Sequence, residues 1–263
     1  RSLVIGSEGT LGVVVGATLK LRRLIAGQTR TLTASFLDVR HAAGAAAAVT
    51  ASGVQPAIME LMDAASLDAV HRLLGLPAPE AGAAQLTIQT DGPAASDEVE
   101  SIAATLAAYG GTVRLAADDA EADLLWQVRR SMHPAMETLG TALIEDVSVP
   151  RSALPDMFDE IARIERAYGL VIPTVCHAGD GNLHPNFIVD GPEIPDHVWE
   201  AAGELFQAAL RLGGTLTGEH GVGILKRRCL ADELGPDQWE LQRAITRVFD
   251  PAGILNPGKV FAP

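Results

Sequence analysis

Residues 28–62 of this chain read QTRTLTASFLDVRHAAGAAAAVTASGVQPAIMELM, and their pattern sets the expected fold class. Residues 28–38 and 57–62 have the composition and length that are typical of strands. The alanine-rich run at 39–52 between them is typical of a helix. Asp63 follows at a position where an N-cap would start a further helix.

The same order of elements recurs along the chain. Residues 85–90 and 111–115 have the pattern of strands, and residues 96–109 between them have the pattern of a helix. A strand–helix–strand order that occurs twice is typical of a ferredoxin-like unit. The second half has the same rhythm, with expected helices at 118–139, 152–168, 195–212 and 236–249 and expected strands at 141–149, 171–178 and 183–189. We therefore predict an α+β fold of duplicated ferredoxin-like units, in which helices cover an antiparallel sheet.

Two further strand-like runs, residues 1–5 and 13–21, flank the motif Gly6-Ser-Glu-Gly-Thr-Leu-Gly12. Its three glycines permit positive φ angles and let backbone amides approach a phosphate closely. A plain hairpin turn explains the same spacing, and the motif is not the GxGxxG of a Rossmann site. Because the chain starts without methionine inside a strand-like run, we expect it to be a fragment of a longer protein.

Composition narrows the functional classes. The 263 residues hold 33 acidic and 20 basic side chains, for a formal net charge of −13, which disfavours nucleic acid as a partner. No apolar run reaches the 18 residues or so that a membrane span needs. Cys176 and Cys229 are too few for a disulfide framework, so we expect free thiols, a reducing compartment and a cytoplasmic protein.

The strand-like runs 171–178 and 183–189 are joined by Gly179-Asp-Gly-Asn182. Asp-Gly is a strong signal for a two-residue type I′ hairpin turn. That turn would pair residue 177 with residue 184, so His177 and His184 would be direct neighbours across the two strands. Their Cβ atoms would then lie about 4.5–5.5 Å apart on one face.

Two histidines on one face beside a tight turn indicate a metal site, and Asn186 belongs to the same face. The glycine-rich run 213–223, GGTLTGEHGVG, adds Glu219 and His220. Two imidazoles and one carboxylate form a ligand set that leaves coordination positions open for catalysis. The alternative is that Glu219 caps a backbone turn and that His220 is only solvated.

Together these motifs resemble the FAD-linked D-2-hydroxy acid dehydrogenases, a family that includes D-lactate dehydrogenase, the glycolate oxidase FAD subunit and D-2-hydroxyglutarate dehydrogenase. The resemblance is carried by GSEGTLG at 6–12, HAGDGNLH at 177–184, GEHGVG at 218–223 and DPAGILNPGK at 250–259. These segments extend over the whole chain in the order typical of the family.

The resemblance implies three regions. Residues 1–24 would be the end of an FAD-binding domain, residues 25–249 a substrate and cap domain with the metal site, and residues 250–263 a flavin-contacting tail. Most of the flavin site would then be missing, so we expect this fragment to be inactive alone. The flavin-contacting residues that the family pattern marks are Gly6, Ser7, Glu8, Gly9, Thr10, Gly12 and Asn256.

The resemblance also implies a mechanism. His177, His184 and Glu219 would bind a divalent metal, with zinc or manganese expected. A metal that holds the substrate hydroxyl lowers its pKa, and His220 would act as the general base that removes the proton. The C2 hydride would pass to flavin N5, chemistry that belongs to the cofactor.

Arg129, in a Trp-x-x-Arg segment, would hold the substrate carboxylate, and Asn186 would also contact substrate. His133 and Ile144 replace a threonine and a lysine of the D-2-hydroxyglutarate enzymes. Because that lysine helps to bind a second carboxylate, we expect a smaller substrate such as D-lactate or glycolate.

Two other functional classes explain parts of the pattern. A zinc-dependent hydrolase would use His177, His184 and Glu219, but it would not explain the glycine-rich start or the tail. A non-catalytic subunit of a flavoprotein complex is the third. The expected partners are a small 2-hydroxy acid, an unidentified electron acceptor, and a second copy or a flavoprotein complex. We interpret Lys226-Arg-Arg228 as a solvated face and Cys176 as core packing.

Overall fold

The computed structural model describes residues 2–21, 23 and 26–261. Its strands are β1 (Arg30–Phe36), β2 (Ile58–Met62), β3 (Ala84–Thr90), β4 (Thr112–Leu115), β5 (Thr141–Ile144), β6 (Val147–Ser148), β7 (Thr174–His177) and β8 (Asn182–Val189). Its helices are α1 (Val39–Ala51), α2 (Ala64–Leu74), α3 (Ala95–Ala108), α4 (Asp119–Arg130), α5 (Met132–Glu137), the 3₁₀ turn η1 (Arg151–Ala153), α6 (Leu154–Tyr168), α7 (Asp196–Arg211) and α8 (Arg227–Phe249).

The strands form one eight-stranded sheet in the order β4-β1-β3-β2-β7-β8-β5, with β6 paired to β8. Every pairing is antiparallel. The first four strands have the β4-β1-β3-β2 order of a ferredoxin-like unit. The second unit has the equivalent order, except that an isolated bridge between Ser148 and Thr215 replaces its fourth strand. The predicted α+β fold is confirmed, and the two units join where β2 pairs with β7.

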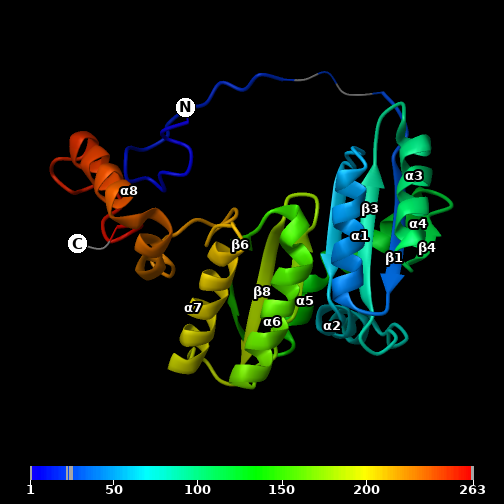
Figure 1. The fold of residues 1–263 in the computed structure, drawn as a ribbon. Coiled ribbons are helices and arrows are strands. Elements are labelled where there is room, and N and C mark those ends of the chain that lie inside the picture. Colours follow the sequence, from blue (N-terminus) through cyan, green and yellow to red (C-terminus); the bar gives the residue numbers. More distant parts are fainter. Residues whose placement is uncertain (1, 22, 24–25, 262–263) are drawn as a thin grey trace.

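Helices cover the two faces of the sheet differently. One layer contains helices α3, α1, α6 and α7, which pack side by side in that order (Figure 1). Leu61, Cys176 and Leu183 point into that layer and are fully buried, so the core-packing interpretation of Cys176 is confirmed. Burial also raises the pKa of the Cys176 thiol well above its usual value. Helices α2, α4 and α5 lie on the opposite face, which carries the polar residues of the site.

The predicted cap of α2 is confirmed. Asp63 accepts a hydrogen bond from the amide of Ser66 (2.8 Å), and Gly75 ends the helix in the left-handed conformation. The second oxygen of Asp63 accepts from the amide of Thr174 (2.8 Å), at the start of β7. Asp63 therefore attaches α2 to the strand that ends at His177.

Three predicted elements have different bounds in the structure. The helix expected at 118–139 is broken at Ser131 into α4 and α5. The strand expected at 141–149 is interrupted at 145–146, where the buried Asp146 side chain bonds to a distant loop. The helix expected at 236–249 is the second half of α8, because Gly235 leaves helical geometry (φ 67°, ψ 172°) before Pro236.

The two strands expected at the start of the chain are wrong for the residues that the structure describes. Residues 2–5 form turns and residues 13–21 have no regular structure, while Arg1 lies outside the described residues. The side chains of Val13, Val14 and Val15 are 77%, 69% and 95% exposed. Alternation alone does not make a strand, because its N–H and C=O groups need a neighbouring strand.

Figure 1 shows the amino-terminal segment beside α8, far along the molecule from β1. Within the described part of the chain, no helix combines the length and apolar character that crossing a bilayer requires.

Candidate metal centre and active site

The hairpin β7–β8 brings the two histidines together in a register that differs from the predicted one. His177 pairs with Asn182, and Val175 pairs with His184. The four-residue loop 178–181 closes through the carbonyl of His177, which accepts from the amides of Asp180 (2.9 Å) and Gly181 (3.0 Å). The type I′ turn is therefore wrong, and Asp180 does not take the positive φ that it requires.

Neighbouring strands explain the longer loop. The amide of Val149 donates to the Gly181 carbonyl (2.9 Å), and the amide of Gly179 donates to the Met59 carbonyl (3.3 Å). These two hydrogen bonds fix both ends of the loop, so residues 180–181 do not form the two-residue turn that an isolated Asp-Gly sequence favours.

A shift of two residues keeps every side chain on its predicted face, because side chains alternate with a period of two. His177 and His184 are therefore diagonal neighbours, not directly opposite ones. Their ring centroids lie 5.1 Å apart with an interplanar angle of 82°.

The loop 213–223 places Glu219 between the two imidazoles. Its Oε1 lies 3.1 Å from His184 Nε2 and 3.5 Å from His177 Nε2. One ligand atom from each of these three residues lies within 4.8 Å of the others. The His184 side chain is 9% exposed and that of Glu219 is 55% exposed, so the group has a buried side and an open side.

This donor set fits a divalent metal. Two imidazole nitrogens and one carboxylate oxygen are the ligands of catalytic zinc sites, and both ligand types also suit manganese.

The ring of His220 stacks on that of His184, with centroids 5.0 Å apart and an angle of 20° between the planes. His220 is exposed and stands outside the three-residue metal group.

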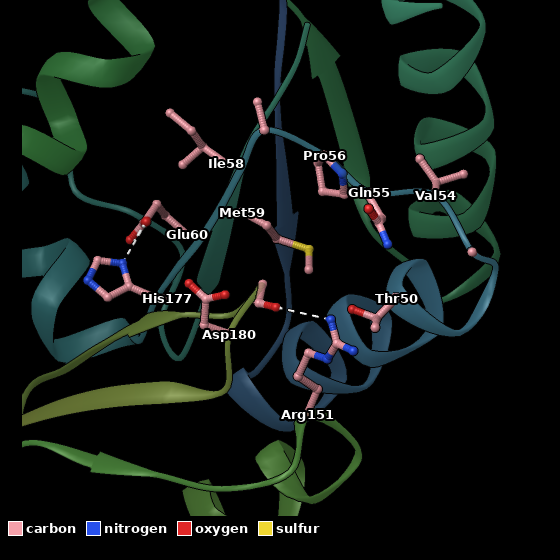
Figure 2. Close-up of a pocket in the computed structure, with 13 residues that line it drawn as sticks. Thr50, Val54, Gln55, Pro56, Ile58, Met59, Glu60, Arg151, His177 and Asp180 are labelled. Atoms are coloured by element: carbon pink, nitrogen blue, oxygen red, sulfur yellow. Dashed lines mark hydrogen bonds and ion pairs between the residues drawn. The ribbon is translucent and has the colours of Figure 1, made fainter. Parts of the chain in front are cut away.

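Glu60 completes the site, and the sequence patterns did not single it out. Its Oε1 accepts a hydrogen bond of 2.7 Å from His177 Nδ1, as Figure 2 shows, because a carboxylate can only accept here. This bond turns His177 Nε2 toward Glu219. The bond to Glu60 raises the pKa of His177 against the opposing effect of burial. The available signal was one carboxylate inside the apolar strand 57–62.

Glu60 also holds Arg129, the candidate substrate clamp. Arg129 Nε and Nη2 each lie 2.9 Å from Glu60 Oε2. One edge of the guanidinium is therefore occupied, and Arg129 lies one side chain away from His177. Asn186 lies on the same strand face as His184, but its Nδ2 donates to the carbonyls of Pro173 (3.1 Å) and His184 (2.8 Å).

We expect Glu60→Gln to weaken metal binding by the chain about 10–100-fold, because residues that orient a metal-bound histidine have effects of this size. The neutral amide would orient His177 less strongly and would leave Arg129 without its ion pair. Isothermal titration with Zn²⁺ measures this change. The control is Glu137→Gln, whose exposed carboxylate pairs only with the surface residue His133. Equal affinities for both variants would contradict the role of Glu60.

Lys226 is buried, so its interpretation as part of a solvated face is wrong. It is 4% exposed, and its Nζ donates to the Asp146 carbonyl (2.6 Å). The turn before α8 directs Lys226 inward, while Arg228, two residues further on, is exposed as expected. Lys226 Nζ also lies 3.8 Å from Glu145 Oε2, although neither Glu145 oxygen has a hydrogen-bond partner among the described residues.

Glu145 should make folding stability depend on pH. Burial raises its pKa from 4.5 to about 7, despite the opposing charges of Lys226 and Arg228, and Asp146 adds to the rise. The folded state therefore binds this proton more tightly than the unfolded state. The stabilisation that the protonated Glu145 side chain contributes to the folded state is fully present below pH 4.5. It is lost as the pH rises to about 7.

We expect Glu145→Gln to remove this dependence, so that its stability relative to the wild type rises by on the order of 3 kcal/mol between pH 4.5 and 8. Urea unfolding at several pH values measures the difference. If the free energies of unfolding of the variant and the wild type differ by the same amount at every pH, the pKa of Glu145 is not raised by folding.

The predicted flavin-contacting segments lie against each other. Glu8 accepts hydrogen bonds from the amides of Val222 (2.6 Å) and Gly223 (2.7 Å), just after His220, and Asn256 Nδ2 donates to the Glu8 carbonyl. Thr10 is buried and donates to the Ser7 carbonyl (2.7 Å). A hollow of about 510 Å³ includes in its lining Ser7, Glu8, Gly9, Gly12 and Asn256. Gly6, Gly9 and Gly12 all have positive φ.

A second hollow of about 330 Å³ includes His177 of the candidate ligand group in its lining (Figure 2). Glu60 and His177 line one part of it, and Arg151 and Asp180 line another. Arg151 Nη1 donates to the Gly179 carbonyl (3.3 Å) in the hairpin loop. A molecule in this hollow could therefore reach the ring of His177.

Comparison with known proteins identifies relatives along the whole chain. Residues 26–260 match the family described as FAD linked oxidases, C-terminal domain. The chain is 36% identical to glycolate oxidase subunit GlcD of Bacillus subtilis over 269 residues, which cover 99% of this chain and 56% of that protein. It is 32% identical to a mitochondrial D-lactate dehydrogenase [cytochrome] of Arabidopsis thaliana, over 99% of this chain and 47% of that protein. The chain thus spans about half the length of the curated relatives that it matches.

Solved structures share the fold at lower identity. An alkyldihydroxyacetonephosphate synthase superposes with a TM-score of 0.62 at 16% identity, over 96% of this chain and 48% of that one. A p-cresol methylhydroxylase with bound substrate superposes with a TM-score of 0.63 at 14% identity, over 89% of this chain and 53% of that one. At these identities the likeness concerns the fold alone.

Proposed function

Because this chain belongs to the family of C-terminal domains of FAD-linked oxidases, we propose that it is the substrate and metal half of an enzyme that oxidises a small D-2-hydroxy acid, with D-lactate or glycolate favoured. The observation that carries the proposal is the convergence of His177, His184 and Glu219, with His220 stacked beside them. Two relatives are named glycolate oxidase and D-lactate dehydrogenase, which supports the same substrate class.

In the proposed site, His177, His184 and Glu219 hold the divalent metal, zinc or manganese. A bound metal would supply Lewis acidity that lowers the pKa of a substrate hydroxyl. Glu60 fixes the ring of His177 through Nδ1 and thereby directs Nε2 toward the ligand group. Burial lowers the pKa of His184, and the nearby His177 adds to this effect, which favours the neutral imidazole that a metal binds.

His220 is the proposed base, and it receives the proton of the substrate 2-hydroxyl. Its exposed ring stacks on His184, so it lies at the open side of the ligand group. The free edge of the Arg129 guanidinium is proposed to bind the substrate carboxylate. Asn186 is proposed to contact substrate through its amide oxygen, since its nitrogen is bound to two carbonyls.

Gly6, Ser7, Glu8, Gly9, Thr10, Gly12 and Asn256 are the residues of this chain proposed to contact FAD. Five of them line the hollow between the amino-terminal loop and the tail, next to the loop that carries His220. Bound FAD would accept the hydride from C2 of the substrate. The remaining flavin contacts are proposed to come from a preceding FAD-binding domain, with residues 1–24 as its end and 250–263 as the tail.

A small substrate is favoured over a dicarboxylate. Ile144 faces Asn186 across β5 and β8, so an apolar side chain stands where a second carboxylate would need a cation. The name of the Bacillus relative as a subunit supports a flavoprotein complex as the partner, and a cytoplasmic location remains a prediction from the two free cysteines.

The test uses this chain in a polypeptide that spans the full length of its relatives and measures the flavin absorbance. Addition of D-lactate or glycolate without oxygen should bleach the flavin, and a dye acceptor should restore it. An unbleached flavin, together with zinc-dependent cleavage of a simple ester, would favour the alternative hydrolase that uses His177, His184 and Glu219.

A further inference from the structure

The loop that carries Glu219 and His220 has little regular backbone structure of its own. Residues 213–223 contain five glycines and form turns and bends, with one isolated bridge at Thr215. Glycine-rich segments lose much conformational entropy when they are fixed. Contacts from outside the loop must therefore determine where Glu219 and His220 lie.

Those contacts come mainly from Asp146, between β5 and β6. Its Oδ2 accepts from the amides of Gly218 (2.8 Å), Glu219 (3.1 Å) and His220 (2.9 Å). The same oxygen accepts from Thr217 Oγ1 (2.9 Å). Three consecutive amides thus converge on one carboxylate oxygen.

The other oxygen of Asp146 links this loop to the histidine hairpin. Oδ1 accepts from Asn182 Nδ2 (2.6 Å), and Asn182 pairs with His177 across β7 and β8. A Cβ on Gly218 would lie 2.2 Å from Asn182 Nδ2, so the loop backbone passes too closely for a side chain. One carboxylate therefore connects the segments that hold all three metal ligands.

Asp146 is itself held in place. Its side chain is fully buried, and Lys226 Nζ donates to its carbonyl (2.6 Å) and lies 3.5 Å from Oδ2. Burial acts to raise the pKa of Asp146, but the hydrogen bonds from Asn182 and His220 and the charge of Lys226 hold it well below its usual range. The Asp146 carboxylate is thus fixed in place by Lys226 and by its hydrogen-bond donors.

We propose that Asp146 is a positioning residue, whose buried carboxylate, anchored by Lys226, fixes the backbone of residues 218–220 and so sets the places of Glu219 and His220. Asp146 does not bind the metal or the substrate, since its two oxygens face the donors of Asn182 and the loop. The catalytic meaning of this role rests on the proposed function, whereas the role itself concerns only the conformation of the loop.

The test compares Asp146→Asn with Glu145→Gln in the 263-residue chain. Both variants replace a buried carboxyl group beside Lys226 with an amide, but neither Glu145 oxygen has a hydrogen-bond partner among the described residues, the loop included. Amide hydrogen exchange, measured residue by residue by NMR, should become about tenfold faster or more at residues 218–220 in Asp146→Asn. Affinity for Zn²⁺ should fall about 10–100-fold in the same variant. Glu145→Gln should match the wild type in both measurements.

Unchanged exchange at 218–220 in folded Asp146→Asn would overturn the proposal, and so would equal acceleration in Glu145→Gln. Faster exchange with unchanged Zn²⁺ affinity would also overturn it, because Glu219 would then not depend on Asp146. If Asp146→Asn does not fold, Thr217→Val is used instead, because it removes one donor to the Asp146 carboxylate. Unchanged amide exchange at residues 218–220 in that variant would overturn the proposal. A wild-type chain that binds no Zn²⁺ would contradict the proposed function, and the exchange rates would still decide the role of Asp146.

Discussion

Replacing His220 with alanine is expected to lower kcat for a 2-hydroxy acid about 10²–10⁴-fold, the range typical of a lost general base. The ring of His220 stacks on that of His184 but lies outside the three-residue ligand group. The substitution should therefore remove proton transfer and leave metal binding almost unchanged. The measurement is kcat with a dye acceptor, in a polypeptide that spans the full length of the relatives, together with the metal content of the same sample.

The control for this experiment is His197→Ala, which removes an exposed imidazole from the first turn of α7, outside the site. It should have the wild-type kcat. A His220→Ala variant that retains wild-type kcat and metal would show that another group accepts the proton. A variant that loses its metal would instead place His220 among the ligands.

The second large effect is expected from His184→Ala, which should abolish the stabilisation of the chain by metal. A ligand that binds only the folded state at a hundred times its Kd stabilises it by about 2.7 kcal/mol. For a domain of this size, that corresponds to a rise in Tm of roughly 5–10 °C. His184 is largely buried and its Nε2 faces Glu219, so alanine removes a ligand without leaving a substitute.

The measurement is Tm with and without Zn²⁺ or Mn²⁺, for the wild type, His184→Ala and the control His41→Ala. His41 lies in α1, and its side chain bonds to Asp38, away from the sheet face of the site. We expect the metal-dependent rise in the wild type and the control. An equal rise in His184→Ala would mean that the metal binds elsewhere.

Local sequence patterns predicted the antiparallel sheet and most of its helices and strands, although not all of their bounds. The first unit follows from residues 28–115, where the order of strand-like and helix-like runs and the N-cap at Asp63 agree with one another. The breaks at Ser131 and at residues 145–146 were not predictable in this way, because tertiary contacts cause them. Asp146 leaves the strand pattern to bond with a loop more than 70 residues away.

The candidate site shows the same division. The face shared by His177 and His184 was predicted correctly, because the observed register differs from the predicted one by two residues and side chains alternate with a period of two. Their register was not, because contacts from Val149 and Met59 hold the hairpin loop. Glu60 and Lys226 were missed or misread for a related reason. Their positions depend on which strands and turns meet, and the pairing of β2 with β7 joins segments 117 residues apart.

Anomalous diffraction at the zinc absorption edge, from crystals of the 263-residue chain grown with Zn²⁺, tests the metal centre most directly. We predict one strong peak about 2.0–2.2 Å from His177 Nε2, His184 Nε2 and a carboxylate oxygen of Glu219. Zinc bound only at other residues, with these three side chains ordered and without density between them, would contradict the metal centre and the dehydrogenase chemistry proposed for it.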